Sequence, residues 1–108
     1  PYTFILPSNN NLHAVFKKKK TVGIRVPDNT IAIELVILLG NPIISTSIKD
    51  EDEVIEYTTD PSLIVEKWDK LVDFVIDGGY GGNIGSTIID LTGDEPVLVR
   101  EGKGSVEL

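Results

Sequence analysis

The sequence predicts a domain of the α+β (α/β) class, in which β-strands are combined with helices. Short runs rich in β-branched and aromatic residues predict strands, and two capped segments predict helices. Clusters of glycine, proline and asparagine separate these segments, as turns do. The length of 108 residues is typical of one domain, so we expect a single domain over residues 1–108.

The predicted strands are short, and each is bounded by residues that favour turns. The last two are joined by a polar connection over residues 92–96, which predicts a hairpin. After them, we expect residues 103–108 to form a flexible tail. The predicted strands cover residues 2–6, 21–26, 43–46, 72–76, 86–91 and 97–99.

Two helices are predicted from their caps. Asp28 or Asn29 can cap a helix over residues 30–39, which carries one charged residue and should be nearly buried. Proline is favoured in the first turn of a helix, so Asp60 followed by Pro61 predicts a second helix over residues 61–70. A helical turn is expected over residues 12–16 and an exposed acidic loop over residues 49–56.

Composition excludes several classes of chemistry. The chain has no cysteine and a single histidine, His13, so disulfides, thiolate catalysis and two-histidine metal motifs are excluded. We therefore expect no protein-bound metal or prosthetic group. The longest apolar run is too short to span a bilayer and no signal peptide opens the sequence, so we expect a cytoplasmic protein that does not bind membranes.

Two arginines and two short hydroxyl clusters are the candidates for a binding site. Arg25 alternates with apolar residues in a predicted strand, and Arg100 ends the last strand. A guanidinium in either place is suited to phosphate or carboxylate if its face lines a cleft, but it is equally typical of a solvated strand edge. The hydroxyl clusters are Ser45-Thr46-Ser47 and, after a glycine-rich loop, Ser86-Thr87. Together they could form an anion-binding site, although serine and threonine are also common in turns.

A run of four cations, Lys17, Lys18, Lys19 and Lys20, is a weaker candidate for contact with a nucleic-acid backbone. Four lysines before a strand are also typical of a solvated loop. The net charge of −7, from 17 acidic and 10 basic residues, disfavours unspecific binding to nucleic acid by the chain as a whole.

Taken in order, a series of motifs resembles the YrdC/YciO family and is most similar to its YciO branch. Each motif is short, but the ordered set covers almost the whole chain. The motifs are Pro1-Tyr2-Thr3-Phe4-Ile5-Leu6, Lys20-Thr21-Val22-Gly23-Ile24-Arg25-Val26-Pro27-Asp28, Ser45-Thr46-Ser47, Val72-Asp73-Phe74-Val75-Ile76-Asp77-Gly78-Gly79, Ser86-Thr87-Ile88-Ile89-Asp90-Leu91 and Val99-Arg100-Glu101-Gly102.

The resemblance implies a twisted mixed β-sheet with flanking helices around a concave cleft, a YrdC/RibB-like fold. It also implies an activity in which L-threonine, bicarbonate and ATP, the last with Mg²⁺, give threonylcarbamoyl-adenylate and pyrophosphate for modification of adenosine 37 of tRNA. Carried over by position, the nucleotide- and substrate-binding residues would be Thr3, Arg25, Ser45, Ser47, Ser86 and Arg100.

Two departures from the family pattern bear on this expectation. Family synthases usually carry Ser-x-Asn after the serine cluster, whereas this chain has Ser47-Ile48-Lys49. The N-terminal half of the family, with its Lys and Arg motif, has no counterpart here, and the chain starts at Pro1 rather than at a methionine. We therefore expect a C-terminal portion of the domain that is inactive alone.

Two alternatives to a nucleotide-binding enzyme fragment stay open. One is a module that binds double-stranded RNA or tRNA, which would require the lysine run and both arginines to converge on one face. The other is a structural remnant that self-associates through an exposed sheet edge.

Overall fold

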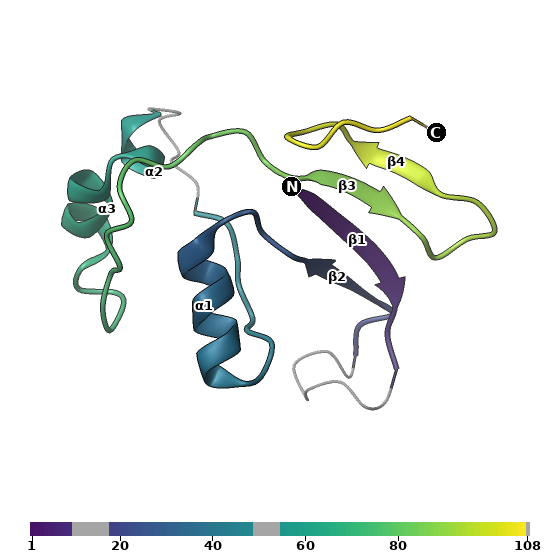
Figure 1. The fold of residues 1–108 in the computed structure, drawn as a ribbon, viewed down its shortest axis with the longest axis horizontal. Helices are drawn as coiled ribbons and strands as arrows, with labels where there is room; N and C mark the ends of the chain where they lie inside the picture. Colours follow the sequence, from purple (N-terminus) through teal and green to yellow (C-terminus); the bar gives the residue numbers. More distant parts are fainter. Residues whose placement is uncertain (10–17, 49–54, 108) are drawn as a thin grey trace. The chain divides into compact units, whose positions relative to one another are not determined.

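The computed structural model describes residues 1–9, 18–48 and 55–107 of the chain. It divides into a sheet unit, Pro1–Glu34 with Ile84–Leu108, and a helical unit, Leu35–Asn83. Figure 1 labels the elements along the chain, which are β1 (Tyr2–Pro7), β2 (Thr21–Arg25), α1 (Thr30–Leu39), α2 (Glu56–Thr59), α3 (Pro61–Trp68), β3 (Thr87–Asp90) and β4 (Val97–Arg100).

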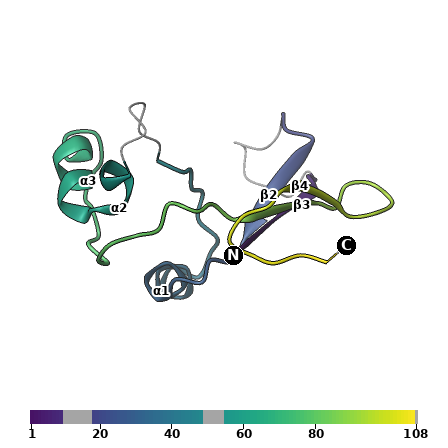
Figure 2. The ribbon, with the colours of Figure 1, turned by 90° about the horizontal axis from the view of Figure 1, so that it is seen from above.

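The sheet unit contains a four-stranded mixed sheet in the order β2-β1-β3-β4. β1 pairs antiparallel with β2 and parallel with β3, and β4 pairs antiparallel with β3. Figure 2 shows the strands running at an angle to one another, the twist that β-sheets normally have. The predicted α+β class with a twisted mixed sheet is confirmed, as is the hairpin between the last two strands.

The buried side chain of Thr87 joins the segment after β4 to the sheet. Its hydroxyl accepts hydrogen bonds from the amides of Gly102, at 3.0 Å, and Gly104, at 2.9 Å, and donates to the Gly104 carbonyl at 2.5 Å. The Lys103 amide donates to the Gly85 carbonyl at 2.9 Å, and the Tyr2 hydroxyl donates to the Ser105 carbonyl at 2.7 Å.

These contacts differ from the flexible tail expected for residues 103–108. Figure 2 shows the segment after β4 running along one face of the sheet. The reason is the buried threonine, since its hydroxyl offers the polar partner that the amides of Gly102 and Gly104 need.

The helical unit contains α2 and α3, joined at Asp60. The Asp60 carboxylate accepts a hydrogen bond from the Ser62 amide at 3.0 Å, which makes it the N-cap that the Asp-Pro pair predicts. The pKa of this carboxyl is lowered mainly by the hydrogen bond that it accepts from the Ser62 hydroxyl, and to a smaller extent by the one from the Ser62 amide. The Gly81 amide from the glycine-rich loop donates to the Thr59 carbonyl at 2.9 Å, so this loop is held against α2.

Helix α1 begins and ends as predicted. The Asn29 side chain accepts a hydrogen bond from the Ala32 amide at 3.0 Å, and the helix ends at Gly40, whose φ of 78° is the left-handed conformation that glycine tolerates. The prediction that this helix is nearly buried is wrong, because none of its residues is buried in the structure.

The strands predicted over residues 43–46 and 72–76 are also wrong, since both segments are irregular in the structure. An apolar run becomes a strand only where a neighbouring strand takes up its backbone hydrogen bonds, and the structure pairs neither of these segments with a strand of the sheet. The helical turn predicted over residues 12–16 and most of the acidic loop lie outside the described residues.

Replacing Thr87 by valine should destabilise the fold, because valine keeps the shape but leaves two amides and a carbonyl without their partner. Each buried group left unsatisfied costs about 1–3 kcal/mol, so for three groups we expect a loss of at least about 3 kcal/mol in the free energy of unfolding. Urea denaturation of Thr87→Val measures it, with the exposed Thr21→Val on β2 as the matched control. Equal midpoints for the two variants would contradict this role of Thr87.

Gly102 should tolerate no side chain. A Cβ there would meet the Gly85 carbonyl oxygen and lie 2.7 Å from the Ser86 carbonyl carbon, and neither backbone atom can move cheaply. We expect Gly102→Ala to lower the free energy of unfolding by about 1–3 kcal/mol. The control is Gly93→Ala, where an added Cβ meets nothing within 4 Å. A Gly102→Ala protein as stable as the control would contradict this packing.

Candidate functional site

One end of the sheet carries a row of four paired residues that includes both candidate arginines. The register pairs Arg25 with Thr3, Thr3 with Ile88, and Ile88 with Arg100. Residues that pair directly across strands place their side chains on the same face. We call these four residues the arginine row. The sheet therefore brings two arginines that are 75 positions apart in the chain (100 − 25) onto one face.

The pairing of Arg100 depends on an irregularity in the ladder between β3 and β4. Ile89 pairs with Leu98, but its neighbour Ile88 pairs with Arg100, so Val99 is an extra residue in β4. A bulge of this kind changes which face a side chain occupies. Without it Val99 would take the place of Arg100 in the row.

The next row across the sheet lies on the opposite face and is apolar. It pairs Ile24 with Phe4, Phe4 with Ile89, and Ile89 with Leu98. Because side chains alternate along a strand, the polar groups of the site and these apolar groups are separated onto the two faces of the sheet.

Ser86, just before β3, joins the arginine row through hydrogen bonds. Its hydroxyl lies 2.6 Å from the Thr3 hydroxyl and 3.4 Å from Nη2 of Arg100. Its carbonyl accepts from Nε of Arg100 at 3.0 Å and from Nη2 at 2.7 Å. The residue is buried, so the serine has a fixed position.

Gly85 is needed for this arrangement. A Cβ at Gly85 would lie 2.6 Å from Nη2 of Arg100 and 3.0 Å from its Cζ. The last glycine of the loop therefore has a packing role, because the guanidinium lies flat against the backbone there. No signal in the sequence of this loop indicated a contact with Arg100.

Arg25 has a different environment from Arg100. Its side chain is exposed, and it makes no hydrogen bond or ion pair with any residue that the structure describes. Three strand spacings of about 4.8 Å separate the main chains at Arg25 and Arg100, which gives roughly 14 Å.

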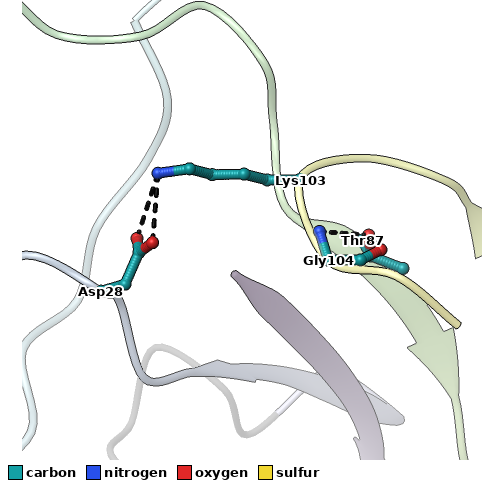
Figure 3. A network of polar contacts seen from close by, with 4 residues as sticks. All are labelled: Asp28, Thr87, Lys103 and Gly104. Carbon is teal, nitrogen blue, oxygen red and sulfur yellow. Dashed lines mark hydrogen bonds and ion pairs between the residues drawn. The ribbon is translucent and has the colours of Figure 1, made fainter.

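An ion pair links the segments that follow the two edge strands (Figure 3). Asp28 lies three residues after Arg25, Lys103 lies three residues after Arg100, and Nζ of Lys103 is 3.2 Å from Oδ2 of Asp28. The hydrogen bond from Lys103, and then its charge, lower the pKa of the Asp28 carboxyl below 3.8. Neither residue was among the predicted site residues, and only their equal spacing from the two arginines could have suggested the pair.

The other predicted residues that the structure describes are not in the strands of the sheet. Ser45 and Ser47 are exposed residues of the helical unit. Lys18, Lys19 and Lys20 are exposed in a turn, where the Lys20 carbonyl accepts from the Ser8 amide at 3.0 Å and the Lys19 carbonyl from the Ser8 hydroxyl. Lys17 lies outside the described residues, as does His13. The sheet thus brings together four of the predicted residues, Thr3, Arg25, Ser86 and Arg100.

Within the described ranges, no group of three or more His, Cys, Asp or Glu side chains has the arrangement of a metal site. None of the helices in those ranges is both long enough and apolar enough to cross a membrane.

Comparison with known proteins decides the family. A model of the Sua5/YciO/YrdC family, described as telomere recombination, matches residues 1–102. The chain belongs to the Sua5/YciO/YrdC family. The crystal structure of Escherichia coli YciO superposes with a TM-score of 0.84 at 44% identity, covering 98% of this chain and 52% of that one.

Two further relatives place the chain within the Sua5/YciO/YrdC family. An uncharacterized protein of Haemophilus influenzae is 45% identical over 96% of this chain and 51% of its own length. The threonylcarbamoyl-AMP synthase of Pyrococcus abyssi is 32% identical over 94% of this chain and 30% of its own length. The chain spans about half the length of the YciO relatives it matches. The resemblance found in the sequence is therefore confirmed at the level of the family.

The pH dependence of stability should reveal the Asp28–Lys103 pair. A carboxyl whose pKa is lowered on folding stabilises the fold above its unfolded-state pKa, and the contribution is lost as pH falls through the folded-state value. Asp28→Asn should therefore lower the melting temperature at neutral pH, and this effect should shrink as pH falls through the lowered pKa of the Asp28 carboxyl. The effect should be small, since the two side chains are 54% and 49% exposed, and smaller still in high salt.

Thermal unfolding followed by circular dichroism makes this measurement. Asp94→Asn, in the connection between β3 and β4, is the control because Asp94 makes no ion pair with the described residues. A difference between Asp28→Asn and wild type that stays the same from neutral pH down through the acid range in which carboxyls become protonated would contradict the assignment.

Proposed function

We propose that this chain is part of a nucleotide-binding enzyme that resembles threonylcarbamoyl-AMP synthase, and that the arginine row with Ser86 binds ATP as its magnesium complex. The observation that carries the proposal is the placement of Arg25 and Arg100 on one face of the sheet, with the hydroxyls of Thr3 and Ser86 between them. Guanidinium and hydroxyl donors in one row are the groups that phosphate oxygens require.

The chemistry of adenylate formation fits such a site. Threonine and bicarbonate would condense to a carbamate with loss of water. An oxygen of the carbamate would attack the α-phosphorus of ATP, and the bond to pyrophosphate would break. The charge that develops lies on phosphate oxygens, so positioned cations and hydrogen-bond donors contribute more to catalysis than a protein nucleophile would.

The proposal has a second part in the helical unit. Ser45 and Ser47 would supply hydroxyl donors to ligand oxygens, and both are exposed as this role requires. The YciO relatives are about twice as long as this chain and the Pyrococcus abyssi synthase about three times as long, so the proposal for this chain is ligand binding and does not extend to turnover.

The alternative of an RNA-binding module has less support. The net charge of −7 opposes attraction to a polyanion, and of the lysine run only Lys18, Lys19 and Lys20 are described, as exposed residues of a turn. Titration with a tRNA or a double-stranded RNA at two salt concentrations tests this alternative directly.

The main test is calorimetric titration of the chain with ATP and magnesium. We expect binding, and we expect Arg25→Gln to weaken it about tenfold to a hundredfold, since a hydrogen bond to a charged group contributes about 1.5–3 kcal/mol. Lys70→Gln, which removes an exposed cation from the helical unit, is the control and should bind as wild type does.

The same titration with L-threonine tests for the second substrate. A wild-type chain that binds neither ATP nor threonine would refute the proposed function. An Arg25→Gln protein that binds ATP as tightly as the control would refute the assigned site.

A further inference from the structure

The two arginines of the row differ in what they already bind. Arg100 uses Nε and Nη2 to donate to the carbonyl of Ser86, at 3.0 and 2.7 Å. The side chain of Arg25 makes no hydrogen bond or ion pair within the described part of the chain. The family resemblance implies that both side chains contact the ligand. Their contacts in the structure instead favour different roles for the two.

The guanidinium of Arg100 directs two of its N–H groups at the protein backbone and not outward. Nε and Nη2 form one edge of the planar guanidinium, and both converge on a single carbonyl oxygen. Gly85 lets that plane approach the backbone, because any side chain there would meet Nη2. A guanidinium held on one edge in this way has lost much of the freedom it would need to follow a ligand.

The Arg100 guanidinium is also close to the Ser86 hydroxyl. That oxygen lies 3.4 Å from Nη2 of Arg100 and 2.6 Å from the Thr3 hydroxyl. A serine hydroxyl accepts two hydrogen bonds and donates one. When Arg100 and Thr3 both donate to it, its own proton is left for an oxygen of a bound ligand.

We propose that Arg100 is a positioning residue that holds the Ser86 hydroxyl as a hydrogen-bond donor to the ligand, while Arg25 is the cation that contacts phosphate. The assignment rests on the proposed ATP site. It divides the arginine row into a contacting end on β2 and a positioning end on β4.

A double-mutant cycle separates positioning from contact, since residues that act through one another give non-additive effects. ATP affinity is measured by calorimetry for Arg100→Gln, Ser86→Ala and the double variant. We expect each single change to weaken binding by about tenfold, the scale of one hydrogen bond, and the double variant to bind no more weakly than the poorer single one. Arg25→Gln combined with Ser86→Ala should instead give the product of the two single effects.

The conservative variant Arg100→Lys gives a second, independent readout. Lysine keeps the charge but cannot place two donors of one rigid plane on the Ser86 carbonyl. We expect Arg100→Lys to bind ATP as weakly as Arg100→Gln, and neither to change the salt dependence of binding, whereas Arg25→Gln should reduce that dependence. Arg100→Lys also serves in the cycle if Arg100→Gln does not fold, as judged by circular dichroism.

The outcomes are distinguishable. The positioning role would be overturned if the double variant of Arg100 and Ser86 lost ATP affinity by the product of the two single losses, or if Arg100→Lys bound ATP as tightly as wild type. Either result would leave the ATP site in place. A wild-type chain that binds no ATP would overturn the proposed function and this inference with it.

Discussion

The hydrogen bonds of the buried Thr87 hydroxyl are the contact on which the sheet unit depends. One oxygen accepts from the amides of Gly102 and Gly104 and donates to the Gly104 carbonyl, and so ties the segment after β4 to the start of β3. The same segment carries Lys103, whose ammonium reaches Asp28 beyond the end of β2 (Figure 3). A single buried side chain thus fixes the end of the sheet at which the arginine row lies.

The site is built from backbone pairing more than from side-chain packing. β1 and β3 are parallel neighbours separated by about eighty residues of chain, so the N-terminal ends of both strands lie at the same end of the sheet. Their antiparallel partners β2 and β4 place their C-terminal ends there. Thr3 is therefore near the start of β1 and Ser86 lies just before β3, while Arg25 and Arg100 end β2 and β4. The four residues meet because of this topology.

This topology explains which parts of the fold could be predicted from the sequence. The four strands, α1 and α3 are local features, set by β-branched runs and by the caps Asn29 and Asp60, and they were predicted closely. The mixed arrangement of the strands came from the family resemblance, because no local pattern reports that β1 pairs with β3. The strands expected over residues 43–46 and 72–76 are absent for the same reason, as apolar composition does not supply a pairing partner.

The candidate site was predictable in its residues but not in its division of roles. Arg25 alternates with apolar neighbours, which fixes its face once the strand is known. Arg100 reaches that face only through the bulge at Val99, and its contact with Ser86 needs the bare backbone of Gly85. A bulge and a glycine contact depend on residues distant in the chain, so sequence alone gave two equivalent arginines where the structure has two different environments.

The strongly acidic composition is compatible with an anion site because electrostatic influence is local. At physiological ionic strength, exposed charges more than about 8 Å apart are largely screened from one another. A phosphate beside Arg25 would respond mainly to the guanidinium and to adjacent donors, and only weakly to most of the 17 acidic residues. The net charge of −7 acts instead on long polyanions, which extend well beyond one screening length. The same chain can therefore disfavour RNA and still be compatible with the nucleotide site proposed above.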